Sequence, residues 1–317
     1  MRILVVGGAG YLGGAVTDLL LKTKHQVKVY DALLYEETYR KEVDFIYGDI
    51  RDKKKLTPYL KWADTIVWLA ALVGDGACAL NPKVSFEINT QPLQLLANID
   101  KRIIFTSTCS VYGEHKGLLD ESSSVKPLSV YASTKLAAEK YLINRNALIF
   151  RIGTLFGLGD NYSRIRMDLV VNTLTAKAFF EKKLNVFGGD QYRPVLHVFD
   201  AARAIVENVG GHEKGIYNLS SENIKIIDLA KKYKKHFKDL NIKVSPLKFE
   251  DARNYSVSTE KANKELEFQP KISIDEGILE IKKLLNEHRV KDIGSPRYTN
   301  QIFLQMFNTH LLKNDKS

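Results

Sequence analysis

A glycine-rich turn, GGAGYLG at residues 7–13, constrains the fold more than any other feature. It directly follows the apolar run RILVV and opens the helical pattern YLGGAVTDLLLKT. Gly7, Gly10 and Gly13 have GxxGxxG spacing, and glycines there permit a tight turn whose backbone N–H groups approach a diphosphate at the helix start. A strand, this turn and a helix in succession predict the first unit of a dinucleotide-binding α/β sheet.

The rest of the N-terminal half repeats this alternation of strands and helices. Helical patterns separate the apolar runs QVKVYD, VDFIYGD, TIVWLAA, RIIFTST and ALIFRIG. The segment NPKVSFEINTQPLQLLANI is expected as one helix, kinked at Pro92. This order predicts an α/β fold with a Rossmann-type, doubly wound parallel sheet.

After Arg151 the alternation becomes less regular. LNVFG, PVLHVFD and IYNLS are expected as strands among helical segments, which predicts a smaller C-terminal α/β substrate-binding lobe. We expect the Rossmann domain at residues 1–152 with a return segment near 190–220, and the lobe at residues 153–189 and 221–290. Residues 291–317 form a C-terminal tail.

Composition narrows the class of protein. The chain has 317 residues with 44% hydrophobic and 26% charged residues, and no apolar run approaches the ~20 residues of a membrane helix. Two cysteines make no disulfide framework and no zinc spacing, so we expect reduced thiols, a cytoplasmic setting and no metal. The net charge of +10 comes from lysines dispersed over helical patterns, which favours solvated faces over a nucleic-acid partner.

An acidic residue after the second strand bears on the cofactor. Asp31 ends QVKVYD, where a carboxylate can accept hydrogen bonds from the adenosine ribose and would repel a 2′-phosphate. The expected cofactor is therefore NAD rather than NADP. Asp49, in GDIRD after the third strand, either reaches the adenine edge together with Ile50 or caps the next helix.

A tyrosine and a lysine are candidates for acid–base chemistry. Tyr131 and Lys135, in YASTK, lie one helical turn apart and so share a face. An ammonium near a phenol favours the phenolate and makes tyrosine a usable general base. Their helix follows the strand end TSTCSVYG, and strand ends line one crevice in such a sheet.

These motifs, in this order, make the sequence resemble the extended short-chain dehydrogenase/reductase family, in its nucleotide-sugar epimerase and dehydratase group. LAALVG, DLVVN, RPVLHVFDAARA and the segment at residues 251–270 extend the resemblance to about residue 285. It implies a catalytic triad of Thr108, Tyr131 and Lys135. Thr108 would hydrogen-bond the sugar hydroxyl being oxidised, Tyr131 would remove its proton, and Lys135 would hold the nicotinamide ribose.

The resemblance also implies the remaining contacts. The cofactor would be bound by Gly7, Gly10, Tyr11, Leu12, Gly13, Asp31, Asp49, Ile50, Leu69, Ala70, Ala71, Asn89, Tyr131 and Lys135. A nucleoside-diphosphate sugar would be bound by Val73, Thr108, Cys109, Ser110, Asn172, Arg193 and Arg253. The two arginines suit bidentate phosphate binding, while Asn172 is equally compatible with a helix cap. A homodimer formed by two helices of each subunit is expected too.

Cys109 and Ser110 stand where the 4,6-dehydratases of this family carry an Asp-Glu pair. Neither is a carboxylic acid, so the expected acid for eliminating water is missing, and Cys109 is favoured as a packing residue. The remaining chemistry is oxidation and reduction at C4 of the sugar. A 4-epimerase is favoured; a 4-dehydrogenase or 4-keto reductase is the alternative, followed by a 4,6-dehydratase or a non-catalytic NAD-binding protein.

Overall fold

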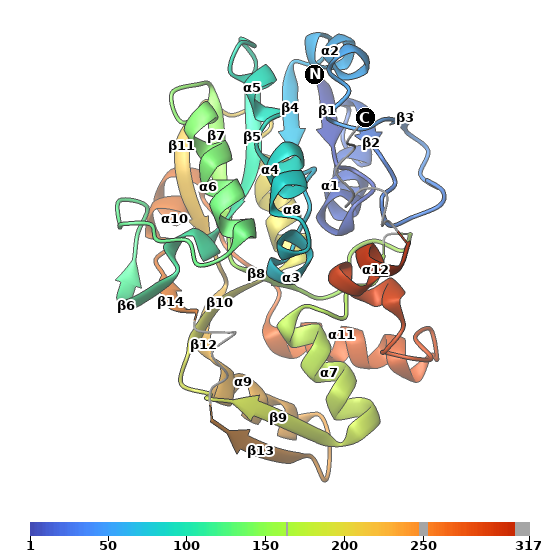
Figure 1. The fold of residues 1–317 in the computed structure, drawn as a ribbon, viewed down its shortest axis with the longest axis vertical. Helices are drawn as coiled ribbons and strands as arrows, with labels where there is room; N and C mark the ends of the chain where they lie inside the picture. Colours follow the sequence, from blue (N-terminus) through green and yellow to red (C-terminus); the bar gives the residue numbers. More distant parts are fainter. Residues whose placement is uncertain (163, 247–252, 308–317) are drawn as a thin grey trace.

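The computed structural model describes residues 1–162, 164–246 and 253–307. Figure 1 shows a large sheet with helices on both faces, and below it a smaller group of helices and short strands. The expected tail therefore lies only partly within the described residues.

The large sheet has seven parallel strands. Their spatial order is β11 (Gly215–Leu219), β7 (Ala147–Ile152), β5 (Arg102–Thr108), β4 (Thr65–Trp68), β1 (Arg2–Val6), β2 (Gln26–Asp31) and β3 (Asp44–Tyr47). The direction of the order reverses between β1 and β4, and in an open α/β sheet ligands bind at the carboxyl ends of the strands beside such a switch point. The predicted Rossmann-type sheet is confirmed.

Apolar side chains bury both faces of this sheet. Ile3 and Val5 of β1 pack toward one face and Leu4 and Val6 toward the other, as the two-residue period of a strand requires. The first face is covered by α1 (Tyr11–Leu21), α8 (Val198–Glu207) and α10 (Glu260–Leu266). The second is covered by α2 (Lys53–Trp62), α3 (Asp75–Ala79), α4 (Pro82–Asn89), α5 (Leu93–Leu96) and α6 (Val130–Leu142).

The smaller part of the molecule has its own cores. Its helices are α7 (Val170–Glu181), α9 (Ile226–Lys232) and α11 (Ile274–Asn286). One short sheet has the strand order β12 (Glu222–Lys225), β10 (Tyr192–His197) and β8 (Thr154–Phe156). A second pairs β13 (Asn241–Ser245) with β9 (Lys183–Phe187). A further pair joins β14 (Asn254–Val257) to β6 (Glu114–Leu119), and α12 (Asn300–Phe307) ends the described chain.

Two expected elements differ from the structure. The single kinked helix is two helices, α4 and α5, because Pro92 has no N–H to continue α4 and instead stands at the N-cap of α5. The expected strand PVLHVFD ends at His197, and α8 begins at Val198. The fully buried Asp200 in its first turn accepts hydrogen bonds from the Lys271 and Ile272 amides, which ties this helix to the chain before α11.

Candidate active site

One large cleft, of about 1310 Å³, lies at the carboxyl ends of the parallel strands. Its walls are the loops after β1, β2, β4, β5 and β7, joined by residues of the smaller part and of the C-terminal segment. Sites for drug-sized ligands usually occupy roughly 300–1,000 Å³, so this cleft is larger than a typical site for one small ligand.

The glycine turn fits a diphosphate. A Cβ on Gly13 would overlap the Gly7 carbonyl oxygen and the Gly8 backbone, so only glycine allows this packing of turn and helix. A Cβ on Gly10, in contrast, would meet protein no closer than 3.4 Å, at the Gly7 oxygen, and Gly10 lines the cleft. Gly10 caps α1 without a side-chain hydrogen bond, so the first amides of α1 remain available to an anion.

Asp31 connects the glycine turn to the loop after β2. Its carboxylate accepts hydrogen bonds from the Ala9 amide (3.0 Å) and the Leu33 amide (2.8 Å), and burial raises its pKa. Asp49 and Ile50 line the same end of the cleft, as do Tyr11 and Leu12. Asp49 does not cap α2: its carboxylate pairs with Arg51 at 2.6 Å, and Asp52 accepts the capping hydrogen bond from the Lys55 amide.

The loop after β4 supplies Leu69, Ala70, Ala71 and Val73 to the cleft wall. Asn89 is buried behind this loop rather than on the cleft wall. Its side chain accepts from the Leu72 amide (2.7 Å) and donates to the Leu72 carbonyl and to Thr134. Asn89 thus fixes this loop against α6, and its expected cofactor contact stays a prediction.

Thr108, Tyr131 and Lys135 all line the cleft, on β5 and α6. The Thr108 hydroxyl accepts a hydrogen bond from the Ser110 amide at 3.1 Å. The Ser129 hydroxyl caps α6, which starts the helix so that Tyr131 and Lys135 lie on one face. Lys135 is 2% exposed, and its ammonium donates to the Thr106 carbonyl at 2.8 Å.

Burial has opposite effects on the two acid–base candidates. It raises the pKa of Tyr131, with Cys78 and Asp75 acting in the same direction. It lowers the pKa of Lys135 to about 8. From the sequence, Lys135 is expected to lower the pKa of Tyr131. In the protein without ligand, burial is the largest influence on this pKa, and it raises it.

A buried ion pair supports this wall from behind. Arg151 of β7 pairs with Glu139 of α6 at 2.7 Å and donates to the Tyr112 hydroxyl at 3.0 Å. Ser107, next to Thr108, donates to the same Glu139 carboxylate. The pair thus joins β5, β7 and α6, although nothing in the sequence pattern distinguishes Arg151 or Glu139 from surface charges.

Cys109 and Ser110 separate at the end of β5. Ser110 lines the cleft, and its hydroxyl lies 3.1 Å from that of Tyr255. Cys109 is fully buried away from the cleft, with its thiol 3.1 Å from the Arg151 carbonyl, and burial raises its pKa. The structure therefore removes Cys109 from the expected substrate contacts and gives it a packing role beside Val111 and Tyr255.

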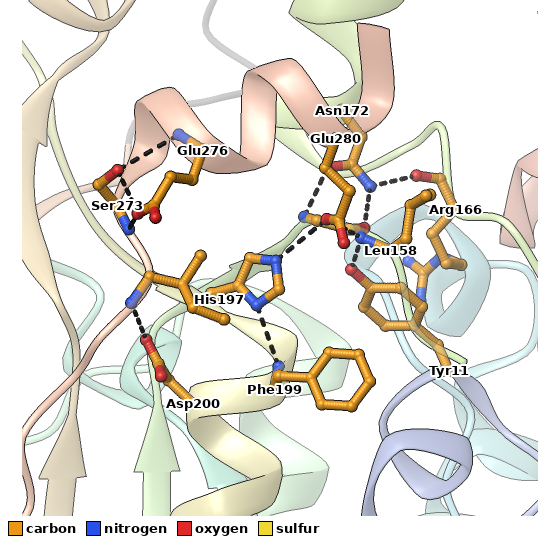
Figure 2. Close-up of polar contacts among 12 residues, drawn as sticks. Tyr11, Leu158, Arg166, Asn172, His197, Phe199, Asp200, Ser273, Glu276 and Glu280 are labelled. Carbon is orange, nitrogen blue, oxygen red and sulfur yellow. Dashed lines mark hydrogen bonds and ion pairs between the residues drawn. The ribbon is translucent and has the colours of Figure 1, made fainter. Parts of the chain in front are cut away.

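Asn172 does not line the cleft either. Figure 2 shows its amide side chain directed at the loop that starts at Gly157: it accepts from the Gly157 amide and donates to the Gly157 and Arg166 carbonyls. The Tyr11 hydroxyl donates to the same Gly157 carbonyl at 2.7 Å. Asn172 is therefore a positioning residue for this loop. Beside it, His197 contacts Glu280 at 3.1 Å and packs edge-on against Phe156.

Arg193 and Arg253 both line the cleft. Arg193 donates to the carbonyl oxygens of Tyr192 and Arg253, so the two arginines lie close together. The Arg253 guanidinium pairs with Asp75 of α3 at 2.7 Å, across the cleft from β14. Guanidinium groups suit bidentate contact with a diphosphate, and both of these arginines belong to the cleft lining.

The sequence predictions miss several polar residues of the cleft, among them Arg164, Arg166, Asp168 and Asn300. The first three lie between β8 and α7, in a stretch where no motif indicates a site. Asn300 lies in the tail, where no motif indicates a site. Among the described residues, none form a cluster of three or more His, Cys, Asp or Glu side chains that could hold a metal ion.

Comparison with known proteins identifies the family. Residues 3–220 match the NAD dependent epimerase/dehydratase family. The chain belongs to this family. It is 26% identical to the UDP-glucose 4-epimerase of Corynebacterium glutamicum over 304 residues, covering 85% of this chain and 91% of that protein. It is 25% identical to the CDP-paratose 2-epimerase of Salmonella typhi over 329 residues, covering 88% and 97%.

Solved structures agree on the fold. The dTDP-glucose 4,6-dehydratase of Streptomyces venezuelae, with NAD bound, superposes with a TM-score of 0.79 at 24% identity, covering 91% of this chain and 98% of that one. The cofactor of the family is NAD, and the predicted cofactor is confirmed. The names of these three proteins span three reactions, so membership of the family does not by itself identify the reaction. Within the described residues no helix is long and apolar enough to cross a membrane.

Proposed function

We propose that this chain is an NAD-dependent 4-epimerase that acts on a nucleoside-diphosphate sugar by oxidation and re-reduction at C4. The observation that carries the proposal is the cleft wall at the end of β5. Thr108, Tyr131 and Lys135 line it together, whereas the next two residues, Cys109 and Ser110, have no carboxyl group. The similarity to the Corynebacterium 4-epimerase supports the same reaction.

The residues divide the chemistry between them. Thr108 holds the C4 hydroxyl of the sugar, and Tyr131 takes the proton of this hydroxyl as the carbonyl forms. The cationic Lys135 stabilises the phenolate, and this offsets the effect of burial on Tyr131. NAD, when bound, would supply the acceptor and the donor of the C4 hydride. Epimerisation requires the ketone to present its other face before it is reduced, and Tyr131 then gives the proton back to the C4 oxygen.

The arginines hold the substrate's diphosphate. Arg193 of β10 and Arg253, which directly precedes β14, lie at the cleft wall, and a guanidinium group suits bidentate contact with phosphate oxygens. Holding the diphosphate leaves the sugar free to rotate about its bond to phosphate, which the change of face requires. The expected homodimer and the expected domain boundaries stay predictions.

The carboxylates of the cleft argue against dehydration. Asp75 is paired with Arg253 at 2.7 Å, and Asp168 with Arg166 at 2.5 Å. An acid for removing water from the sugar would be needed next to Thr108, and Ser110 there bonds Tyr255 instead. Redox chemistry at C4 without elimination uses only groups that this wall supplies.

A panel of nucleotide sugars tests the proposal. The protein is incubated with NAD and UDP-, GDP-, dTDP- or CDP-sugars, and the product mass and the redox state of the cofactor are measured. An isomer of unchanged mass, with the cofactor still oxidised at the end, supports a 4-epimerase. Loss of two hydrogens with accumulating NADH identifies a 4-dehydrogenase instead, and loss of water overturns the exclusion of a dehydratase. The Tyr131→Phe variant is the control and gives no product.

A further inference from the structure

The C-terminal segment, residues 296–307, contributes Thr299, Asn300 and Gln301 to the cleft wall. Asn300, at the start of α12, is 3% exposed and makes three hydrogen bonds to two separate parts of the wall. Its side-chain amide donates to the Val73 carbonyl (2.7 Å) and accepts from the Arg164 guanidinium, and its backbone amide donates to Asp168 (2.9 Å). One tail residue thus joins the loop after β4 to the loop before α7.

The rest of the segment is anchored on both sides. The Tyr298 carbonyl accepts from the Met167 amide at 3.0 Å, and Leu304 is fully buried in the core that includes Leu72 and Cys78. Phe303 packs against Tyr35, with ring centroids 5.3 Å apart. Figure 1 shows α12 between the large sheet and α11, apart from the preceding helices of the lobe.

Arg164 lies beneath this segment with an unused donor. It is 7% exposed and lines the cleft, and its guanidinium lies 4.0 Å from the centre of the Tyr35 ring. One terminal nitrogen donates to Asn300. The other, Nη1, is buried and has no hydrogen-bond partner in the part of the chain that the structure describes. Buried charged donors are normally paired, so an unpaired one in a cleft indicates a ligand group.

Arg166, in the same loop, has an ion-pair partner and serves as a comparison for Arg164. Its guanidinium pairs with Asp168 at 2.5 Å. Burial and the neighbouring Arg166 lower the pKa of Arg164 to about 10, so Arg164 is still cationic at neutral pH. A cation beside a second cation, with a free donor in a cleft, favours an anionic ligand.

We propose that Arg164, held by Asn300, binds the diphosphate of NAD and that residues 296–307 retain the cofactor through repeated catalytic cycles. The assignment rests on NAD as the cofactor and not on which sugar reaction follows. It differs from Arg193 and Arg253, which the proposed function assigns to the diphosphate of the substrate.

The neighbours of Arg164 place it on the cofactor side. Tyr35 belongs to the loop after Asp31, at the end of the cleft where the adenosine half of a dinucleotide binds. Arg166, two residues on, interacts electrostatically with Tyr11, the first residue of α1, where the diphosphate lies in this fold. A cofactor under the tail leaves only after the contacts of Asn300 break.

Binding measured separately for the two diphosphate ligands tests the assignment. In Arg164→Gln, the affinity for NAD is expected to fall roughly 10- to 100-fold, the range of a lost hydrogen bond to a charged group. The affinity for UDP, as a probe of the substrate side, is expected to stay unchanged. Arg289→Gln is the matched control: it removes one positive charge from an exposed position outside both the cleft lining and this segment, and leaves both affinities unchanged.

The retention by the tail has its own readout. Asn300→Ala leaves the charge of Arg164 in place but removes the side-chain contacts that hold the segment. The dissociation rate constant of NADH, followed by its fluorescence, is therefore expected to rise by at least the same factor as the equilibrium affinity falls. This variant also serves if Arg164→Gln does not fold, which a thermal melt reveals. A loss of UDP affinity with NAD affinity intact assigns Arg164 to the substrate and overturns the proposal. Unchanged NAD affinity in Arg164→Gln together with an unchanged dissociation rate in Asn300→Ala overturns it as well.

Discussion

Two walls of the cleft differ in what they present to a ligand. Along residues 7–13 the wall is backbone: glycines bring the turn against the helix, and the amides at the start of α1 face the cleft. Along residues 157–162, 164–168 and 296–307 the wall is side chains, with Arg164, Arg166 and Asp168 held by Asn300 and by one another. We call these the glycine wall and the closing wall.

The two walls respond differently to substitution. The glycine wall depends on the absence of side chains: an atom added at Gly7 or Gly13 meets backbone, whereas one added at Gly10 enters the cleft. The closing wall depends on a network of hydrogen bonds, so a removed side chain leaves its partners unpaired.

Tyr131→Phe is expected to have the largest effect. It removes the hydroxyl proposed to exchange a proton with the sugar, so turnover should fall by at least about 100-fold, the scale of general acid–base catalysis. Neither wall loses a contact, so NAD affinity should stay nearly constant. Steady-state kinetics and an NAD titration measure the two quantities. Unchanged turnover would refute the mechanism, and lost NAD affinity would show that Tyr131 supports a wall.

Lys135 is expected to make stability depend on pH. Its pKa falls from 10.5 to about 8 on folding, so between these values the unfolded chain binds more protons than the folded one. The free energy of unfolding should therefore rise with pH from 8 to 10.5, by up to about 3 kcal/mol. The measurement is denaturant unfolding of the cofactor-free protein and of Lys135→Met at a series of pH values. The free energy of unfolding of the unmodified protein should rise relative to that of Lys135→Met over this pH window. A difference that does not change with pH contradicts the assignment.

Two alanine variants probe the glycine wall. In Gly13→Ala the new Cβ overlaps the Gly7 and Gly8 backbone, so the free energy of unfolding and the free energy of NAD binding should each weaken by about 1–3 kcal/mol, and the melting temperature should fall. In Gly10→Ala the methyl group extends into the cleft, so NAD affinity alone should fall. Calorimetry of the free protein and NAD titration separate these cases. Equal melting temperatures for the two variants would remove the distinction.

Asn172→Ala probes the closing wall. The change leaves the Gly157 amide and the Arg166 carbonyl without this partner, while the Gly157 carbonyl keeps its hydrogen bond from the Tyr11 hydroxyl; the cost is about 1–3 kcal/mol in unfolding free energy. The loop should then hold the substrate less well, so the Michaelis constant should rise more than turnover falls. If Asn172 touched substrate directly, stability would be unchanged while the Michaelis constant rose.

The sequence predicts the glycine wall far better than the closing wall. Gly7, Gly10, Gly13 and Asp31 lie on one strand–turn–helix–strand unit, so their spacing alone determines what they do. Asn300 and Arg164 are 136 residues apart, and only the path of the tail brings them together. Periodicity cannot show such a contact, because neither residue interrupts or completes a local pattern.

The same limit explains Asn89 and Asn172. Both positions are recognisable from the sequence, but a motif does not show whether an amide faces the cleft or the loop behind it. The structure shows all of their polar atoms bonded to protein. The large sheet, in contrast, is predicted by the alternation of strands and helices. The errors of that prediction at Pro92 and at Val198 concern where a helix starts or stops.

Cys109→Ala is expected to have the smallest effect on activity. The thiol is fully buried on the side of β5 away from the cleft, and its one polar contact is with the Arg151 carbonyl. Removing the sulfur should cost about 1 kcal/mol of stability through a small cavity, with turnover unchanged. Ser110→Ala, one residue on, is the comparison, since it alters the cleft surface and should raise the Michaelis constant. Steady-state kinetics of both variants test this expectation. A large loss of turnover in Cys109→Ala alone would indicate that the thiol takes part in catalysis, and elimination of water would again be a candidate reaction.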